Sequence, residues 1–193
     1  MILEIIISYL IGSLPTGYLL CKFFKNIDIR KYGSGSTGST NVLRITKSKK
    51  LAIITLITDL LKGATVILLF GTQYLCLFFV LIGHVYSVWL NFKGGKGVAT
   101  SAGIFIVLSP TTALCSIIIW LLSLKLFKIS SIASLSMSAS FLLLNIIQHF
   151  YKKEQKELVL FSLLVFVFLC FTHRQNILRL IKKQENMLGN TKI

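Results

Sequence analysis

The chain has 193 residues, of which 54% are hydrophobic, and its mean hydropathy is +0.79. Soluble domains contain roughly 45–50% apolar residues, so this composition excludes an ordinary soluble protein and indicates a membrane protein. The net charge of +15 comes from short basic segments between apolar runs. Because no soluble basic domain gathers this charge, we expect no nucleic-acid partner. We expect contact with anionic lipid headgroups or phosphorylated substrates instead.

Six apolar runs follow one another, and several approach the roughly 20 residues that a bilayer-spanning helix needs. They occupy residues 2–24, 51–70, 74–92, 99–124, 130–149 and 157–172. The first run has no basic segment before it, which is atypical of a signal peptide, so we expect it to remain as a membrane helix. No polar segment is longer than the loop at 25–50, which leaves no room for a soluble domain. We predict a single membrane-embedded, all-α domain, residues 1–193.

The run at 99–124 is long for one span and contains Pro110, which breaks or kinks a helix. It can form one helix or two short ones. Lys and Arg collect in cytoplasmic loops, and two crossings place 18 of the 21 Lys and Arg residues inside, against 14 for one crossing. We therefore predict seven transmembrane helices, some of them short, with the N-terminus outside and the C-terminus in the cytoplasm. Broken helices are tolerated where protein or a watery cavity satisfies the freed backbone, so we expect a site beside them.

Four polar stretches reach the cytoplasmic face in this topology. They are GSGSTGSTNVLR at 33–44, NFKGGKGVAT at 91–100, KISS at 128–131 and HRQNILRL at 173–180. In the first, Gly35 and Gly38 allow backbone amides to turn toward an anion. Ser34 adds a hydroxyl group, and Arg44 adds a planar guanidinium that matches phosphate. A flexible linker has a similar composition, but the ending with Asn41 and Arg44 favours an anion-binding loop.

The second stretch combines glycines with Lys93 and Lys96 before a helix, whose N-terminal amides favour an anion. It is not a P-loop, because Leu90 stands where that pattern needs Gly and Gly97 where it needs Ser or Thr. A basic anchor for the inner leaflet is the simpler alternative, but an anchor does not need glycines. We therefore predict that Lys93 and Lys96 bind phosphate.

In the last stretch, His173 and Asn176 are three residues apart, which places them on one face of a helix. His173 can act as a base or as a hydrogen-bond donor to phosphate, although an interfacial anchor is an alternative for a lone histidine. Ser131 with His173 could mimic a nucleophile and its base. No carboxylate nearby in the sequence orients the imidazole, so we do not expect covalent catalysis. The H-x-x-x-x-D acyltransferase signature is absent at His84 and at His173.

Acidic residues and cysteines are few. The six acidic residues are scattered singly, so no carboxylate cluster is available for Mg²⁺, and we expect neither a metal nor a cofactor. The four cysteines show no CxxC spacing, and we expect buried apolar side chains. Asp59 and Lys62 lie in an apolar helix, where ionisable groups are usually paired or functional. We expect a structural ion pair, in which Arg44 or Lys96 could take part, and expect His84 to cap or orient a nearby loop.

At these residues the sequence resembles the small bacterial membrane glycerol-3-phosphate acyltransferases that use acyl phosphate as donor. The resemblance covers nearly the whole chain. Its motifs are IGSLPTGYLL at 11–20, GSGSTGSTNVLR, DLLKG at 59–63, GHVYSVWLNFKGGKGVATSAG at 83–103 and HRQNILRL. The usual S-G-N-x-G-A departs at Ser36 and Ser39, and Ser87 stands where Pro is common. These changes keep the hydrogen-bonding capacity of the loop.

The resemblance implies a seven-helix enzyme of the bacterial inner membrane, with its active site facing the cytoplasm. Such an enzyme moves a fatty acyl group from acyl phosphate to the 1-hydroxyl of glycerol 3-phosphate, giving lysophosphatidic acid and phosphate, in the first acylation step of phospholipid biosynthesis. It uses neither a metal nor an acyl-enzyme. The implied partners are the two substrates and membrane lipids, and nothing in the sequence points to an obligatory protein partner.

Positions that match the family's functional residues are Ser34, Arg44, Lys96, Ser131, His173 and Asn176. We predict catalytic roles for Ser131, His173 and Asn176. We predict substrate or phosphate binding by Ser34, Gly35, Gly38, Asn41, Arg44, Lys93 and Lys96. A phosphate-ester or lysolipid transporter is the alternative, with its anion site at mid-membrane. Outer loops such as GTQY at 71–74 carry none of the polar stretches, which disfavours alternating access, and a structural subunit would leave the glycines without a purpose.

Overall fold

The computed structural model describes residues 1–152 and 156–187, and every regular element in these ranges is a helix. The predicted all-helical fold is therefore confirmed for the described residues. The chain forms two compact units, one of Met1–Ile104 with Asn186 and Met187, the other of Phe105–Glu185. The prediction of a single domain over residues 1–193 stays a prediction.

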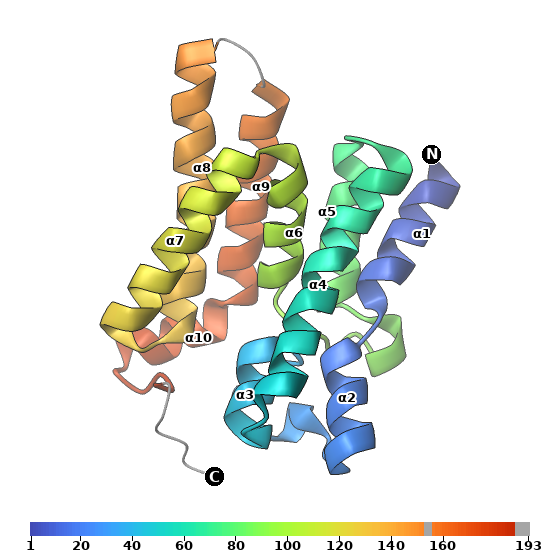
Figure 1. Ribbon diagram of the computed structural model, residues 1–193, viewed down its shortest axis with the longest axis vertical. Helices are drawn as coiled ribbons and strands as arrows, with labels where there is room; N and C mark the ends of the chain where they lie inside the picture. Colours follow the sequence, from blue (N-terminus) through green and yellow to red (C-terminus); the bar gives the residue numbers. More distant parts are fainter. Residues whose placement is uncertain (153–155, 188–193) are drawn as a thin grey trace. The chain divides into compact units, whose positions relative to one another are not determined.

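Helices α1 (Ile2–Ser13) and α5 (Tyr74–Val85) pack closely in the first unit, where both also contact α4 (Lys49–Phe70) (Figure 1). Glycines allow this approach. A Cβ atom on Gly12 would lie 2.1 Å from the carbonyl oxygen of Val80, and one on Gly83 would lie 2.1 Å from that of Tyr9. Membrane helices commonly use small residues in this way to bring their backbones together.

The first apolar run is not one continuous helix, because the chain breaks at Leu14 and Pro15 between α1 and α2 (Thr16–Lys25). Proline has no backbone N–H and disfavours helical geometry in the residue before it. Side chains from distant parts of the chain satisfy the freed carbonyls. Ser87 Oγ donates to the carbonyl of Ser13 at 2.6 Å, and Lys62 Nζ donates to that of Leu14. The break is therefore stabilised by residues far away in the sequence.

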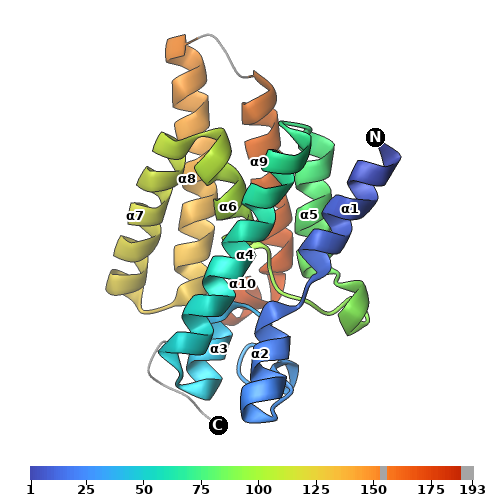
Figure 2. The ribbon, with the colours of Figure 1, turned by 45° about the vertical axis from the view of Figure 1, so that its right-hand side comes forward.

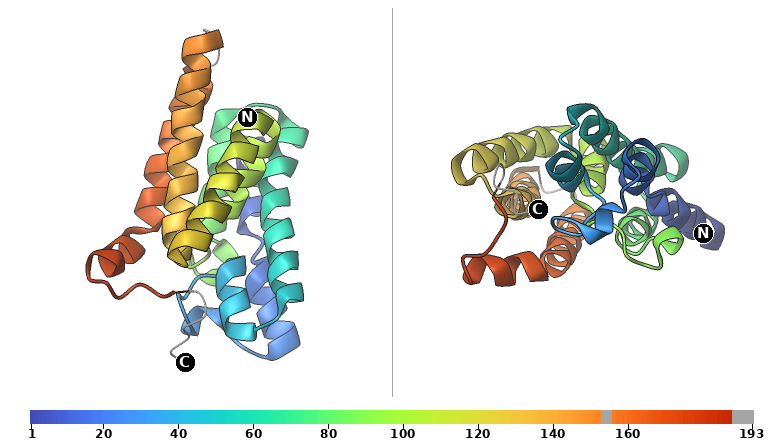
Figure 3. Two further views of the ribbon diagram at one scale, coloured as in Figure 1. Left: turned by 60° about the vertical axis from the view of Figure 1, so that its left-hand side comes forward. Right: turned by 90° about the horizontal axis from the view of Figure 1, so that it is seen from below.

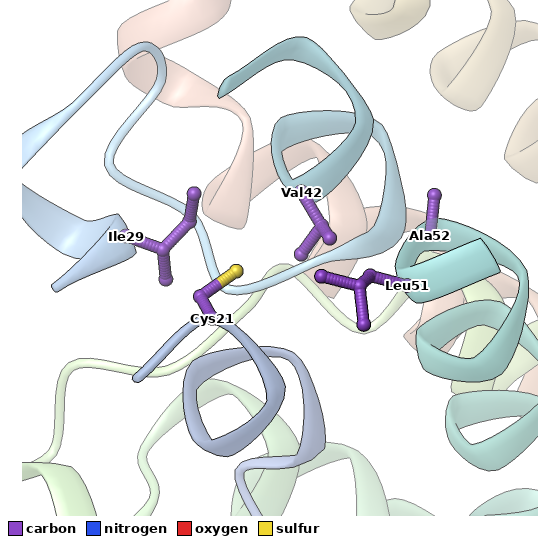
Figure 4. Packing of buried hydrophobic residues seen from close by; sticks show 5 residues of the cluster. All are labelled: Cys21, Ile29, Val42, Leu51 and Ala52. Atoms are coloured by element: carbon purple, nitrogen blue, oxygen red, sulfur yellow. The ribbon is translucent and has the colours of Figure 1, made fainter. Parts of the chain in front are cut away.

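A small apolar cluster packs beside the first glycine-rich loop. Cys21 of α2, Ile29 of η1 (Ile29–Lys31), Val42 of α3 (Ser39–Thr46), and Leu51 and Ala52 of α4 are buried together (Figure 4). The cluster joins both sides of residues 33–38, the part of the first polar stretch that precedes α3, because Ile29 comes before them and Val42 after them. Packing of α2, α3 and α4 therefore fixes where this loop begins and ends.

In the second unit, α8 (Ser130–Lys152) contacts both α7 (Pro110–Phe127) and α9 (Lys156–Thr172) (Figure 2). The rings of Phe105 and Phe141 stack with centroids 4.2 Å apart. A buried polar chain also links the three helices: Thr112 Oγ1 donates to Asn145 Oδ1 at 2.9 Å, and Asn145 Nδ2 donates to Ser162 Oγ at 2.7 Å. Such interhelical hydrogen bonds help membrane helices to associate. The short helix α10 (Arg174–Ile181) turns away from α9 by 61° (Figure 3).

Four helical segments of the described chain are long and apolar enough to cross a membrane, or five if α9 with α10 counts as one span. The four are Ile2–Lys25, Lys49–Phe70, Pro110–Phe127 and Ser130–Tyr151. Helix α6 (Val98–Leu108) is shorter and also apolar, like the region Tyr74–Leu90. These segments agree with an integral membrane protein. Seven spans and the orientation of the termini stay predictions, and Lys153, Lys192 and the C-terminal residue Ile193 lie outside the described residues.

Two expectations about apolar runs have different outcomes. The division at Pro110 is confirmed, since α6 ends at Leu108 and Pro110 opens α7, where a missing N–H costs nothing. The expectation that the run at 74–92 forms one helix is wrong. Helix α5 ends at Val85 and is followed by the short helix η2 (Val88–Leu90). Asn91 and Phe92 then adopt left-handed conformations, with φ of 52° and 60°, which a helix does not contain.

Only part of the cysteine prediction is confirmed. Cys21 and Cys76 are buried, Cys170 is half-buried and Cys115 is exposed. An exposed face of a membrane helix meets lipid rather than water, so the small apolar thiol of Cys115 is compatible with that position.

Replacing Gly12 by Leu should drive α1 away from α5, because even the first side-chain carbon would clash with the carbonyl of Val80. We expect the free energy of unfolding to fall by about 1–3 kcal/mol or more, measured as a lower midpoint of thermal unfolding in detergent. Leu10→Phe is the control, since Leu10 is exposed on the same helix. Equal unfolding midpoints for the two variants would contradict the close packing.

Candidate functional site

Asn41 shapes the first glycine-rich loop. Its Oδ1 accepts a hydrogen bond from the backbone N–H of Ser34 at 3.0 Å, and its Nδ2 donates to the carbonyls of Tyr32 at 3.1 Å and Ser36 at 2.9 Å. Asn41 is only 2% exposed. Because its amide is engaged by the loop backbone, the structure gives Asn41 a positioning role. Its predicted contact with phosphate stays a prediction.

The glycines of this loop differ from one another. Gly35 has a φ of 70°, which favours glycine, but a Cβ atom on Gly38 would meet nothing closer than 3.5 Å. The amide of Gly35 donates to the carbonyl of Tyr32 at 3.0 Å, and that of Gly38 donates to Ser36 Oγ at 3.2 Å. Phosphate binding here would therefore depend more on hydroxyl groups and on Arg44 than on these two amides. Arg44 is half-buried, and its Nη1 lies 3.5 Å from Asn41 Oδ1.

Arg30 fastens the start of the first loop to the region before the second. Its Nε and Nη2 donate to the two carboxylate oxygens of Asp28 at 3.0 and 2.9 Å, and its Nη1 donates to the carbonyl of Leu90 at 3.2 Å. The guanidinium also lies 4.9 Å from the centroid of the Tyr18 ring. The hydrogen bond from Arg30 holds the pKa of the Asp28 carboxyl below its usual value. This contact was not predicted from the sequence.

The second glycine-rich loop folds back onto the end of α5. The amide of Gly94 donates to the carbonyl of Val85 at 2.9 Å, and the amide of Gly95 donates to that of His84 at 3.0 Å. These carbonyls belong to the last turn of a helix and lack partners within it. Lys93 is exposed and Lys96 is half-buried, just before α6 begins. The predicted arrangement of basic residues ahead of a helix is confirmed.

A buried ionic cluster lies in the first unit, which also contains both glycine-rich loops. Lys62 Nζ is 2.6 Å from Asp59 Oδ1, which confirms an ion pair between these two residues. His84 Nδ1 is 3.7 Å from the same carboxylate oxygen and 3.1 Å from Thr100 Oγ1. The cluster lines a small pocket that Thr37 of the first loop and Gly94 of the second loop also line. Both glycine-rich loops therefore border the ion pair.

In the second unit, His173 lies between α9 and α10 and caps the latter. His173 is therefore not inside a helix, because the chain bends by 61° between α9 and α10. Asn176 follows three residues later in α10, and their predicted shared face stays a prediction. His173 is 1% exposed, and its Nδ1 is 2.8 Å from the carbonyl oxygen of Leu169. A carbonyl can only accept, so we assign a proton to Nδ1. In the neutral ring, Nε2 then carries the lone pair.

Glu185 is the functional candidate that the sequence prediction missed. Its Oε1 accepts hydrogen bonds from Asn176 Nδ2 at 2.6 Å and Ser131 Oγ at 3.2 Å, and its Oε2 accepts from Arg179 Nε at 2.7 Å. The carboxylate thus joins two of the three predicted catalytic residues. The available signal was the scarcity of acidic residues, since Glu185 closely follows HRQNILRL in a strongly basic chain.

Metal ligands are not grouped in the described chain. Within residues 1–152 and 156–187, no three His, Cys, Asp or Glu side chains lie together as a set that could hold an ion. The polar groups that the structure gathers are hydroxyls, amides, basic side chains and single carboxylates. Such groups are suited to binding and orienting anionic substrates.

Comparison with known proteins identifies relatives along the whole chain. A family model described as glycerol-3-phosphate acyltransferase matches residues 2–183. The glycerol-3-phosphate acyltransferase of Prochlorococcus marinus (strain NATL1A) is 41% identical over 197 residues, covering 97% of this chain and 98% of that protein. The enzyme of the same name from Ehrlichia canis (strain Jake) is 41% identical over 191 residues, covering 95% and 96%.

Two solved structures are also similar. Both are crystal structures of PlsY, an integral membrane glycerol 3-phosphate acyltransferase. The glycerol 3-phosphate form has a TM-score of 0.87 and 31% identity, and the lysophosphatidic acid form has a TM-score of 0.84 and 29% identity. Each comparison covers 97% of this chain and 95% of the other.

Replacing Glu185 by Gln keeps the side-chain volume but removes the negative charge that Arg179 contacts. We expect turnover to fall and the free energy of unfolding to drop by about 1–3 kcal/mol, since hydrogen bonds to charged groups contribute in this range. Acyltransferase activity and thermal unfolding would measure both effects. Glu157→Gln is the matched control, because Glu157 is exposed in the same unit. If Glu185→Gln behaved like this control, the anchoring role of Glu185 would be wrong.

Proposed function

This chain belongs to the glycerol-3-phosphate acyltransferase family, and from that premise we propose the reaction that it catalyses. It is an acyltransferase enzyme of phospholipid synthesis, built of helices apolar enough to span a membrane. The proposed reaction transfers a fatty acyl group from acyl phosphate to the 1-hydroxyl of glycerol 3-phosphate, giving lysophosphatidic acid and phosphate. The observation that carries it is the family match over residues 2–183, which includes all four polar stretches. A transporter is not favoured, since this family is enzymatic.

The chemistry of acyl phosphate limits what the protein must supply. A bond forms between the substrate hydroxyl oxygen and the acyl carbon, and the bond from that carbon to the phosphate oxygen breaks. Phosphate leaves readily, so the protein mainly aligns the two substrates and stabilises the charge that develops on the acyl oxygen. A substrate phosphate accepts the proton of the attacking hydroxyl. This mechanism needs no acyl-enzyme.

The predicted site residues of the first unit have proposed roles in phosphate binding. The hydroxyl of Ser34 binds the donor phosphate, Gly35 and Gly38 shape the loop around it, and Arg44 and Lys96 bind glycerol 3-phosphate. Both basic residues are half-buried, so their interaction with a phosphate is less screened by water than that of a fully exposed lysine. Lys93 is exposed and adds a longer-range attraction for the two anionic substrates.

The predicted site residues of the second unit have proposed roles of their own. Ser131 donates a hydrogen bond to the donor phosphate in place of the Glu185 carboxylate that accepts it here, and His173 and Asn176 bind glycerol 3-phosphate. With a proton on Nδ1, His173 donates from Nε2 only as an imidazolium, whose positive charge suits a phosphate.

The proposed topology has seven crossings, with the N-terminus outside and the C-terminus and the active site on the cytoplasmic side of the bacterial inner membrane. The crossing segments are α1 with α2, then α4, α5, α6, α7, α8 and α9. The positive-inside rule supports this orientation, and membrane lipids surround the exposed apolar faces. Short α5 and α6 cross most easily where other helices cover their ends.

Purified protein in lipid should release phosphate only when both acyl phosphate and glycerol 3-phosphate are supplied, without added metal. Arg44→Ala and His173→Ala should each lower kcat/KM by roughly 10- to 150-fold, which corresponds to about 1.5–3 kcal/mol for one charge-assisted contact. Lys50→Ala, at an exposed lysine close to α3, is the control. Full activity in both variants, or phosphate release independent of glycerol 3-phosphate, would overturn the proposed site or reaction.

The orientation is testable with cysteines at the two ends of α4. In a chain whose native cysteines are replaced by Ala, we introduce either Lys49→Cys or Thr72→Cys, both at exposed positions. A membrane-impermeant maleimide added to intact cells should label position 72 and should label position 49 only after the membrane is opened. The reverse pattern would show that the proposed orientation is wrong.

A further inference from the structure

We propose that His84 is a positioning residue for the second glycine-rich loop, residues 91–97, and that its ring fixes the place of Lys96. This inference depends on the proposed function, in which that loop binds a substrate phosphate. His84 is in the last turn of α5 and is 6% exposed. It lies beneath the loop, so it acts through the loop backbone rather than by touching substrate.

The edge of the His84 ring lies directly against Gly95. A Cβ atom on Gly95 would be 2.1 Å from Nε2, 2.9 Å from Cδ2 and 3.1 Å from Cε1 of His84, so all three of its nearest atoms belong to the imidazole. Glycine is thus needed at this position because the ring occupies the space of a side chain. The loop backbone therefore follows the surface of the ring.

Three helices hold the ring from its other side. Nδ1 of His84, which is on α5, faces Thr100 Oγ1 of α6 at 3.1 Å and Asp59 Oδ1 of α4 at 3.7 Å. Asp59 is itself fixed by Lys62, whose ammonium also donates to the carbonyl of Leu14. The imidazole consequently lies between the helix that ends before the loop and the helix that begins after it. The ring of His84 therefore helps to fix both the end of α5 and the start of α6, between which the loop runs.

Charged groups in an apolar helix are costly and usually serve a function. The Asp59–Lys62 pair contributes no group to the proposed phosphate contacts, but it supports His84 and the helix break at Leu14. A displaced Gly95 would move the adjacent Lys96, and a shift of about 1 Å at a binding group can reduce catalysis on the order of 100-fold. The ionic cluster thereby influences substrate binding from a buried position.

The adjacent glycine provides an internal control. A Cβ atom on Gly94 would lie 2.2 Å from the carbonyl oxygen of His84 and 2.9 Å from that of Val85, which are backbone atoms. No change of the His84 side chain can relieve that clash. If removing the His84 ring only loosened the packing, it would restore the function of both alanine variants equally. If the ring contacts Gly95 specifically, its removal should restore only Gly95→Ala.

The test combines Gly95→Ala and Gly94→Ala with His84→Asn, which keeps a polar group near Nδ1 but removes the outer part of the ring. Steady-state phosphate release gives KM for glycerol 3-phosphate and kcat. We expect Gly95→Ala to raise this KM on the order of tenfold or more, and the added His84→Asn to bring it back to the value of His84→Asn alone. Gly94→Ala should raise this KM by the same factor in the native chain and in the His84→Asn variant. Absence of this selective coupling would overturn the proposal.

Thr100→Val gives a second route that does not need a glycine replacement to fold. It removes the hydroxyl beside Nδ1, and we expect KM for glycerol 3-phosphate to rise while the unfolding midpoint changes little. Thr58→Val is the matched control, because the Thr58 hydroxyl bonds only to carbonyls of its own helix, Ile54 and Thr55. Equal KM values for these two valine variants would contradict a positioning role for His84.

Lys96→Ala separates this inference from the proposed function on which it depends. If Lys96→Ala leaves KM for glycerol 3-phosphate unchanged, the loop does not bind that phosphate, and both the proposed site and the role of His84 fail. If Lys96→Ala raises KM but the glycine variants show no selective coupling to His84→Asn, only the positioning role fails. A raised KM together with the selective coupling supports both.

Discussion

The buried ion pair of Asp59 and Lys62 is the interaction on which the first unit depends. A charge inside apolar surroundings is stable only if it is paired and hydrogen-bonded. Lys62 meets this requirement with Asp59 and with the carbonyl of Leu14, which the break between α1 and α2 leaves without a helical partner. Asp59 in turn faces His84, beneath the second loop. One pair of charges therefore joins a helix break, the core of three helices and a proposed substrate-binding loop.

Local sequence was enough to predict the features that depend on neighbouring residues. Pro110 divided one apolar run into two helices, the basic residues around Gly94 and Gly95 preceded a helix, and Asp59 and Lys62 paired within one turn. Each follows from proline chemistry, helix ends or helical spacing. The all-helical class follows from the length and apolar character of the runs.

Contacts between distant residues could not be predicted in this way. The break at Leu14 is stabilised by Ser87 and Lys62, and the carboxylate of Glu185 reaches back to Ser131, 54 residues earlier. His173 was expected inside a helix, although it ends one helix and begins the next. At Leu14 the backbone leaves the helical pattern while side chains from elsewhere compensate the lost hydrogen bonds. One sequence does not reveal such distant partners.

Three of the six acidic residues have a similar task in this basic chain. Asp28 orients Arg30, Asp59 fixes Lys62 and faces His84, and Glu185 gathers Ser131, Asn176 and Arg179. Each carboxylate lies close in space or sequence to one of the polar stretches and holds other side chains in defined positions. Long basic side chains lose much rotamer freedom when they bind. Orienting their neighbours in advance reduces the entropy that substrate binding must overcome.

The glycines lead to a related conclusion about rigidity. A glycine-rich segment with serines is typical of a flexible linker, and that alternative was open for residues 33–44. In the structure, Gly12 and Gly83 permit backbones to touch, Gly95 accommodates an imidazole ring, and Gly35 supplies a left-handed turn. Each missing side chain is replaced by a close contact or a defined conformation. Glycine here allows tighter packing of loops and helices, which favours a defined geometry in the loops that we propose to bind phosphate.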